Sequence, residues 1–121
     1  MSLSRVDEKT TVLELVVMVA RFRDSRDWRK HDTPRNLADS ICIEAAELLE
    51  HFQWKTDAQA TEMLRSSETL AEISNELADV MIYCLGFSDI LRIDVSNAIQ
   101  RKLQKNAEKY PVAKQESQPR F

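Results

Sequence analysis

Two stretches of the chain decide the fold, ICIEAAELLEHF at Ile41–Phe52 and ISNELADVMIYCLGF at Ile73–Phe87. In both, apolar residues recur every three or four positions, which is the spacing of one face of an α-helix. The apolar stripe of the first consists of Ile41, Ala45, Leu48 and Phe52, and that of the second of Ile73, Leu77, Val80, Cys84 and Phe87. Both stretches are therefore predicted to be helices that face a common core.

A pair of acids accompanies each stripe, Glu44 with Glu47 and Glu76 with Asp79. At about 100° per residue, the two members of a pair lie about 60° apart along the rim of the stripe. If the helices pack antiparallel, four carboxylates meet at one edge of the contact, where their charges repel one another. A divalent cation would neutralise them, so we predict that these four acids hold a metal ion. Glu50 falls on the far side of its helix, where we expect only a solvated charge.

Length and composition favour a single all-α domain. The chain has 121 residues, enough for a core without disulfides, and contains one Gly and three Pro. Helix formers dominate the remainder, which favours helices over sheets. We predict a bundle of four to five helices within residues 9–111, between a flexible N-terminus at 1–8 and a disordered tail at 112–121.

The charge balance and the cysteines indicate which partners and which cellular compartment to expect. The 17 basic residues are scattered among 20 acidic ones, a net charge of −3 that does not suggest a nucleic-acid surface. Cys42 and Cys84 lack a paired spacing and are expected to be buried free thiols, which fits a reducing compartment. The longest apolar run, residues 13–20, contains Glu14 and is too short to span a membrane. With no signal peptide expected, we predict a cytoplasmic protein without membrane contact.

Helix boundaries follow from caps and breaks. Thr33 before Pro34, the capping box Thr56–Gln59, and Asp94 are expected helix starts. The predicted helices cover residues 9 to about 27, 34 to about 52, 57 to about 64, 70 to about 91, and 95 to about 110, with a loop at 65–69. The fourth of these is apolar on two sides, so it is central or meets another subunit. Gly86 inside it indicates a close neighbour or a bend.

The last helix carries Lys102, Asn106 and Lys109 on one face. Their donors could bind phosphate oxygens, or the face could simply be solvated. Both interpretations remain open at this point.

The acid pairs, Glu44-Ala45-Ala46-Glu47 and Glu76-Leu77-Ala78-Asp79, resemble the ExxE…ExxD motif of the MazG-like all-α nucleotide pyrophosphohydrolases. The flanking motifs are similar to the branch of that family that includes the deoxycytidine triphosphate pyrophosphatases. They are Arg26-Asp27-Trp28, Pro34-Arg35-Asn36-Leu37, Phe52-Gln53-Trp54, Asp79-Val80 with Tyr83, and Lys109-Tyr110-Pro111. The resemblance extends from about residue 22 to residue 111.

This resemblance implies a homodimer or homotetramer that uses Mg²⁺ to hydrolyse a nucleoside triphosphate to monophosphate and pyrophosphate, clearing unwanted deoxynucleotides. It implies magnesium at Glu44, Glu47, Glu76 and Asp79, the nucleobase near Trp28, Trp54 and Tyr83, and phosphate or a subunit contact at Lys102, Asn106, Lys109 and Tyr110. Animal members of the branch carry a histidine nine residues before the tryptophan, where this chain has Val19, so the preferred base stays open.

Within this hypothesis, Glu47 orients or deprotonates the water that attacks the α-phosphorus. The main alternative is a non-catalytic helical module that binds nucleotide or a partner protein. A ferritin-like di-iron bundle is excluded because it requires Glu-x-x-His pairs, and neither His31 nor His51 has a glutamate three residues before it.

Overall fold

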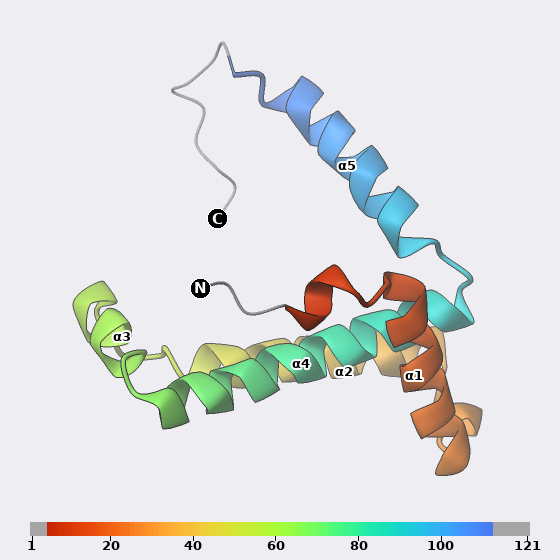
Figure 1. The fold of residues 1–121 in the computed structure, drawn as a ribbon, viewed down its shortest axis with the longest axis horizontal. Coiled ribbons are helices and arrows are strands. Elements are labelled where there is room, and N and C mark those ends of the chain that lie inside the picture. The colour runs from red at the N-terminus through yellow and green to blue at the C-terminus, as the bar shows by residue number, and fades with distance from the viewer. Residues whose placement is uncertain (1–4, 113–121) are drawn as a thin grey trace.

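The computed structural model describes residues 5–112, and every regular element in that range is helical (Figure 1). The elements are η1 (Val6–Glu8), α1 (Val12–Ser25), η2 (Arg29–His31), α2 (Pro34–Glu50), α3 (Asp57–Met63), α4 (Ser67–Ile90) and α5 (Val95–Lys109), where η marks a 3₁₀ turn. The predicted all-α fold is confirmed. The first four residues of the predicted flexible N-terminus, and all but the first residue of the predicted tail, lie outside the described range.

The predicted caps are present at three helices. The side chains of Thr33, Thr56 and Asp94 each accept a hydrogen bond from a backbone N–H in the first turn of α2, α3 and α5. Pro34 occupies the first turn of α2, where its missing N–H removes no helical hydrogen bond. Local chemistry therefore fixes where these helices begin.

Two predicted starts were wrong because their caps went unrecognised. Thr11 forms a capping box with Glu14, so α1 begins at Val12 and not at residue 9. The hydroxyl of Ser66 accepts from the backbone N–H of Thr69 at 3.3 Å, so α4 begins at Ser67. The predicted loop at 65–69 is thus a cap followed by the first turn of the longest helix.

Helices α2 and α4 lie side by side and antiparallel, with α1 packed against α4 (Figure 1). Arg29, just before α2, pairs with Asp89 near the end of α4 at 3.0 Å. At the other end of the pair, His51 lies 3.5 Å from Glu76 in the first half of α4. This is the arrangement that the matched apolar stripes predict.

Little of the apolar surface is covered within one chain. Leu37 and Leu85 are buried, with 2% and 7% of their surface exposed, whereas Leu77 of the predicted stripe is 52% exposed and Ala45 is also exposed. The prediction that these two stripe residues face the core was therefore wrong for the single chain. The antiparallel contact covers only a narrow strip of each helix.

Helix α5 extends away from the α2–α4 pair (Figure 1), and its apolar residues Ile99 and Leu103 are 53% and 61% exposed.

Gly86 is buried, yet a Cβ added there would meet no atom of a neighbouring element within 4 Å, so no close neighbour within the described residues explains the glycine. Both cysteines are free, as predicted, but Cys42 is exposed and not buried. Within residues 5–112, no helix combines the length and the apolar character that crossing a membrane requires.

Candidate functional site

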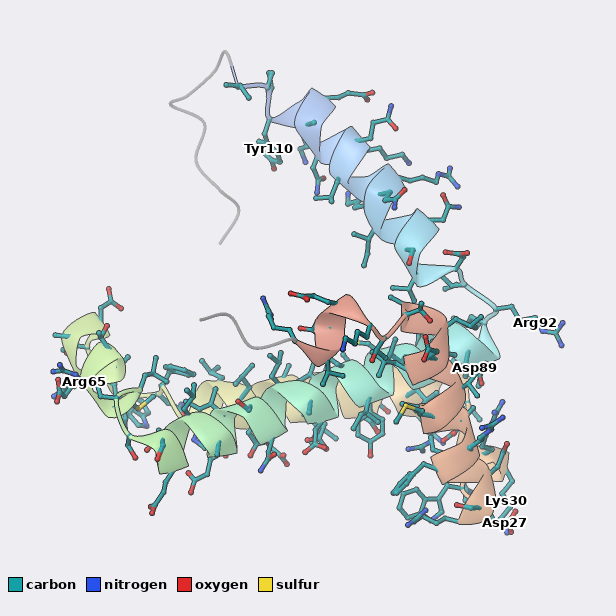
Figure 2. The ribbon with its side chains drawn as sticks, in the orientation of Figure 1. Asp27, Lys30, Arg65, Asp89, Arg92 and Tyr110 are labelled. Atoms are coloured by element: carbon teal, nitrogen blue, oxygen red, sulfur yellow. The ribbon has the colours of Figure 1, made fainter. Side chains whose placement is uncertain are left out.

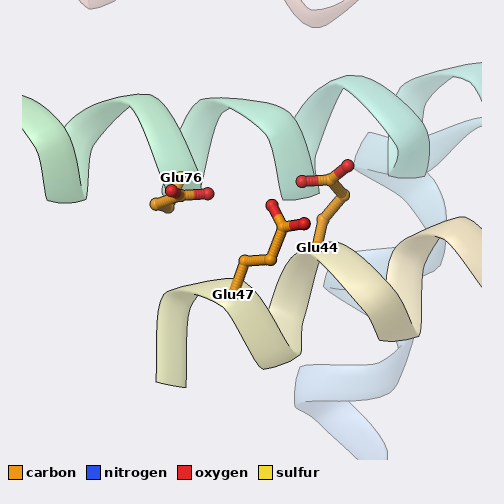
Figure 3. A group of neighbouring side chains, drawn as sticks. All are labelled: Glu44, Glu47 and Glu76. Carbon is orange, nitrogen blue, oxygen red and sulfur yellow. The ribbon is translucent and has the colours of Figure 1, made fainter. Parts of the chain in front are cut away.

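The antiparallel pairing brings three of the predicted acids together. Glu44 and Glu47 of α2 face Glu76 of α4 across the gap between the two helices (Figure 3). Each offers a carboxylate oxygen, and these oxygens all lie within 4.8 Å of one another. The i, i+3 spacing places the two α2 acids on one face, and the packing of α4 supplies the third.

Glu44 is the most perturbed member of this acidic cluster. Burial raises its pKa, and the hydrogen bond and charge of Glu47 raise it further, as do the charges of Asp79 and Glu76. Its Oε2 atom is buried and has no hydrogen-bond partner. A buried oxygen without a donor, surrounded by negative charge, is in an unfavourable state that a bound cation would relieve.

The donor set of the acidic cluster fits a hard divalent cation. Carboxylate oxygens are the ligands that magnesium, calcium and manganese prefer, and magnesium commonly binds through one or two carboxylates while keeping its waters. The unpartnered Oε2 of Glu44 points to the same conclusion. The acidic cluster can therefore hold a divalent ion without a nitrogen or sulfur ligand.

Asp79 lies outside the closely spaced trio. It is exposed, although its charge contributes to the raised pKa of Glu44. The structure thus brings three of the four predicted ligands to one point and Asp79 to its neighbourhood.

A hollow of about 340 Å³ adjoins the acidic cluster and is lined by Glu47, Glu50, His51 and Glu76. Glu50 is exposed, as predicted for a solvated charge, although it also lines this hollow next to the acidic cluster. His51 was not identified as a site residue from the sequence. Its i, i+4 spacing from Glu47 was a signal that could have pointed to it.

A second hollow, of about 360 Å³, contains two of the three predicted base-contacting aromatic residues, Trp28 and Tyr83. Its lining also includes Arg23, His31, Asp32, Asn36, Leu37 and Ser40. Ser40 precedes Glu44 by four residues on α2, and Tyr83 follows Asp79 by four residues on α4. Four residues advance a helix by about 6 Å, so this hollow lies about one turn from the acidic cluster.

The third aromatic residue, Trp54, is not part of this hollow. It follows the end of α2, is 92% exposed, and has a φ of 68°, which is rare for a bulky side chain. Trp28 precedes the start of α2, whose 17 residues span about 26 Å. The two tryptophans of one chain therefore cannot contact the same base.

The predicted phosphate-binding residues of α5 are also distant from the acids. Tyr110 lies at the far end of α5, away from α2 and α4 (Figure 2), and Lys109 Nζ lies 5.5 Å from the centroid of its ring. Lys102 lines a shallow hollow with Arg101 and Lys105, two cations that were not singled out from the sequence. Asn106 lies further along the same helix.

This chain is similar to one protein family and to proteins named as pyrophosphatases. The pattern of the MazG-like family matches residues 40–119. Among curated proteins, "dCTP pyrophosphatase 1" of Homo sapiens is 37% identical over 93 residues, which are 77% of this chain and 55% of that protein. Its Mus musculus counterpart is 32% identical over 108 residues, 89% of this chain and 64% of that protein. The chain thus spans little more than half the length of the human relative.

A solved structure is similar to this chain in fold. The crystal structure of a pyrophosphatase from Archaeoglobus fulgidus superimposes with a TM-score of 0.75 at 42% identity, covering 92% of this chain and 97% of the other. The match extends over the helices that carry the acidic cluster. The chain therefore belongs to the MazG-like family, and within it resembles the dCTP pyrophosphatases, as its paired acidic motifs and their flanks predicted.

Proposed function

We propose that this chain hydrolyses a deoxynucleoside triphosphate to the monophosphate and pyrophosphate, with Mg²⁺ as cofactor. The observation that carries the proposal is the acidic cluster, in which a buried oxygen of Glu44 has no partner, one helical turn from a hollow lined by aromatic rings. The names of the similar proteins, dCTP pyrophosphatase and pyrophosphatase, support the same reaction class.

Glu44, Glu47 and Glu76 would hold the cation, and Asp79 would add a fourth negative charge close to it. A bound divalent ion would neutralise phosphate charge and lower the pKa of a bound water. The contribution of the chain is to hold its carboxylates on two packed helices, so that little reorganisation is needed when the triphosphate binds.

Glu47 is our proposed catalytic residue. Its carboxylate belongs to the acidic cluster and also lines the adjoining hollow, as does that of Glu76. From there it can accept a hydrogen bond from a water in the hollow and take its proton during attack on the α-phosphorus. Glu44 is less suited to this role because one of its oxygens is buried and it does not line this hollow.

The nucleotide would lie along the α2–α4 pair. With the triphosphate at the acidic cluster, a nucleoside extends about one helical turn to the hollow of Trp28 and Tyr83. A volume of about 360 Å³ is within the range of ligand pockets in proteins, and flat aromatic rings suit a flat base.

We propose that the working form is a homodimer or homotetramer. Exposed apolar residues on α4 and α5, including Leu77, Met81, Ile99 and Leu103, support a second copy packed against these helices. Such an assembly would also bring exposed Trp54 of one copy near a site of another. The cations of α5 could reach phosphates only in the same way, or by a movement of α5.

Clearance of unwanted deoxynucleotides from the cytoplasmic pool is the role that we propose for this activity. The two free cysteines support a reducing compartment.

The experiment that tests the proposed function is product analysis with each of the four deoxynucleoside triphosphates. With magnesium, we expect monophosphate and pyrophosphate in equal amounts, and with a chelator no product. Release of diphosphate and phosphate would contradict attack at the α-phosphorus. Tight binding of a triphosphate without any turnover in magnesium would favour a non-catalytic nucleotide-binding module instead.

A further inference from the structure

An ion pair forms part of the wall of the hollow that holds Trp28 and Tyr83. Arg23, near the end of α1, donates from Nε to Oδ2 of Asp32 at 2.6 Å and from Nη2 to Oδ1 of the same carboxylate. Both residues line the hollow. The two parallel hydrogen bonds fix the plane of the guanidinium group relative to the carboxylate.

The pair is mostly withdrawn from solvent. The side chain of Asp32 is 4% exposed and that of Arg23 is 12% exposed, so what remains exposed of the pair belongs mainly to Arg23. Hydrogen bonding to Asp32 is the largest cause that raises the pKa of Arg23, which therefore stays charged. The surface that the pair offers is consequently a cationic donor and not a carboxylate.

Two aromatic rings limit the orientation of this donor. The guanidinium carbon of Arg23 lies 5.6 Å from the ring centroid of Trp28 and 5.4 Å from that of Tyr83. The guanidinium lies over one face of each ring, so a base that enters this hollow and contacts either ring also meets the guanidinium. The chemical complementarity between that edge and the base decides which bases bind well.

The free donors of Arg23 have a defined pattern. A guanidinium has five N–H groups, and the bonds from Nε and Nη2 to Asp32 use two of them. The Nη1 and Nη2 ends still present a pair of parallel N–H donors. Such a fork matches a base edge with two neighbouring acceptors, which are O6 and N7 in guanine and O2 and N3 in cytosine. Adenine and thymine have no such pair, because the group next to each of their acceptors is either an N–H donor or an apolar C–H.

We propose that Arg23, held in position by Asp32, selects nucleotides whose base presents two adjacent hydrogen-bond acceptors, namely cytosine or guanine, over adenine and thymine. This inference rests on the proposed function for the identity of the hollow as the base subsite. It assigns Arg23 as a specificity-determining residue and Asp32 as its positioning residue.

The test compares kcat/KM for the four deoxynucleoside triphosphates in the full-length chain. We expect the cytosine or the guanine substrate to exceed the adenine and thymine substrates by about 10- to 100-fold, the range expected for hydrogen bonds to a charged group. The two favoured substrates, measured separately, tell which base fills the hollow. Arg23→Lys keeps the charge but lacks the fork, so it should bring the four values within a few-fold of one another.

Arg23→Met and Asp32→Asn should reduce the same preference, and the exposed Arg21→Met on the same helix is the matched control that should keep it. A purely structural ion pair predicts a different result, in which all four substrates lose activity by the same factor while their ratios persist. That result would overturn the proposal, as would a wild-type chain that favours adenine or thymine.

A binding measurement separates this inference from the proposed reaction. The four deoxynucleoside monophosphates, titrated in chelator and followed by tryptophan fluorescence, should show the same order of affinity, because Trp28 lines the hollow. If monophosphates bind in that order but no triphosphate is hydrolysed, the proposed function fails and the inference stands. If the wild type hydrolyses all four triphosphates without any base preference, the inference alone fails.

Discussion

Replacing Glu44 by Gln should stabilise the metal-free chain, although a change at a partly buried polar position usually destabilises a protein. Glu44 has carboxylate neighbours within 4.8 Å in Glu47 and Glu76. At that separation, two unit charges repel by about 0.9 kcal/mol in a water-like medium and by about 3.5 kcal/mol at an effective dielectric constant of about 20. Gln is nearly isosteric and removes one charge, and its amide can donate to a neighbouring carboxylate.

The expected gain in unfolding free energy in chelator is therefore about 1 to 3 kcal/mol. For a domain of this size, each kcal/mol raises Tm by about 4 °C. With excess magnesium this gain should be cancelled or reversed. Loss of an anionic ligand should weaken magnesium binding by at least about 100-fold, which removes about 2.7 kcal/mol of stabilisation by the bound ion.

Thermal unfolding with and without magnesium measures both effects, and Glu72→Gln serves as the control because Glu72 is an exposed acid one turn before Glu76 on α4. The control should show neither the gain in chelator nor the loss in magnesium. If Glu44→Gln lowers Tm in chelator and responds to magnesium as the wild type does, the carboxylates are not in electrostatic conflict and our reasoning about the acidic cluster is refuted.

Further predictions concern catalysis, pH, assembly and capping. Glu47→Gln should abolish pyrophosphate release with an unchanged circular dichroism spectrum, and near-normal turnover would remove its proposed role. Because the folded-state pKa of Glu44 is raised above its ordinary value of 4.5, ionising it opposes folding. In chelator, the stability that protonated Glu44 contributes is thus fully present below pH 4.5 and is lost as the pH rises through the raised pKa. When Tm is measured against pH, Glu44→Gln should lack this loss. Parallel curves for the wild type and the variant would contradict the prediction. Leu103→Lys should shift the sedimentation of a homo-oligomer to that of a monomer, whereas unchanged sedimentation would place the subunit contact elsewhere. Asp94→Ala removes the cap of α5 and should cost about 1 kcal/mol of unfolding free energy by chemical denaturation, with no loss if that helix forms only on assembly.

The sequence predicted the acidic cluster because both helices place their acids at the same phase from an apolar stripe. Matched phase in two antiparallel helices is enough to bring side chains together, and Glu44, Glu47 and Glu76 lie together as that argument requires. The same periodicity could not say how far Asp79 stands from the trio, since a small rotation of α4 moves its carboxylate outward.

Other features depend on contacts that no periodicity encodes. The pairing of Arg23 with Asp32 joins residues nine apart across a connector, so only the path of the chain between α1 and α2 brings them together. Leu77 was assigned to the core because it lies on the stripe, but a two-helix contact covers a narrower strip than the stripe itself. Ser66 was assigned to a loop because its role as a cap becomes visible only once the start of α4 is known.

The most direct test of the central claim is to locate a divalent ion in crystals grown with manganese and a non-hydrolysable deoxynucleoside triphosphate. Our account predicts anomalous density in contact with the carboxylates of Glu44, Glu47 and Glu76, with the phosphates of the nucleotide on its other side. Anomalous density at another place, with those carboxylates turned toward solvent, would contradict it.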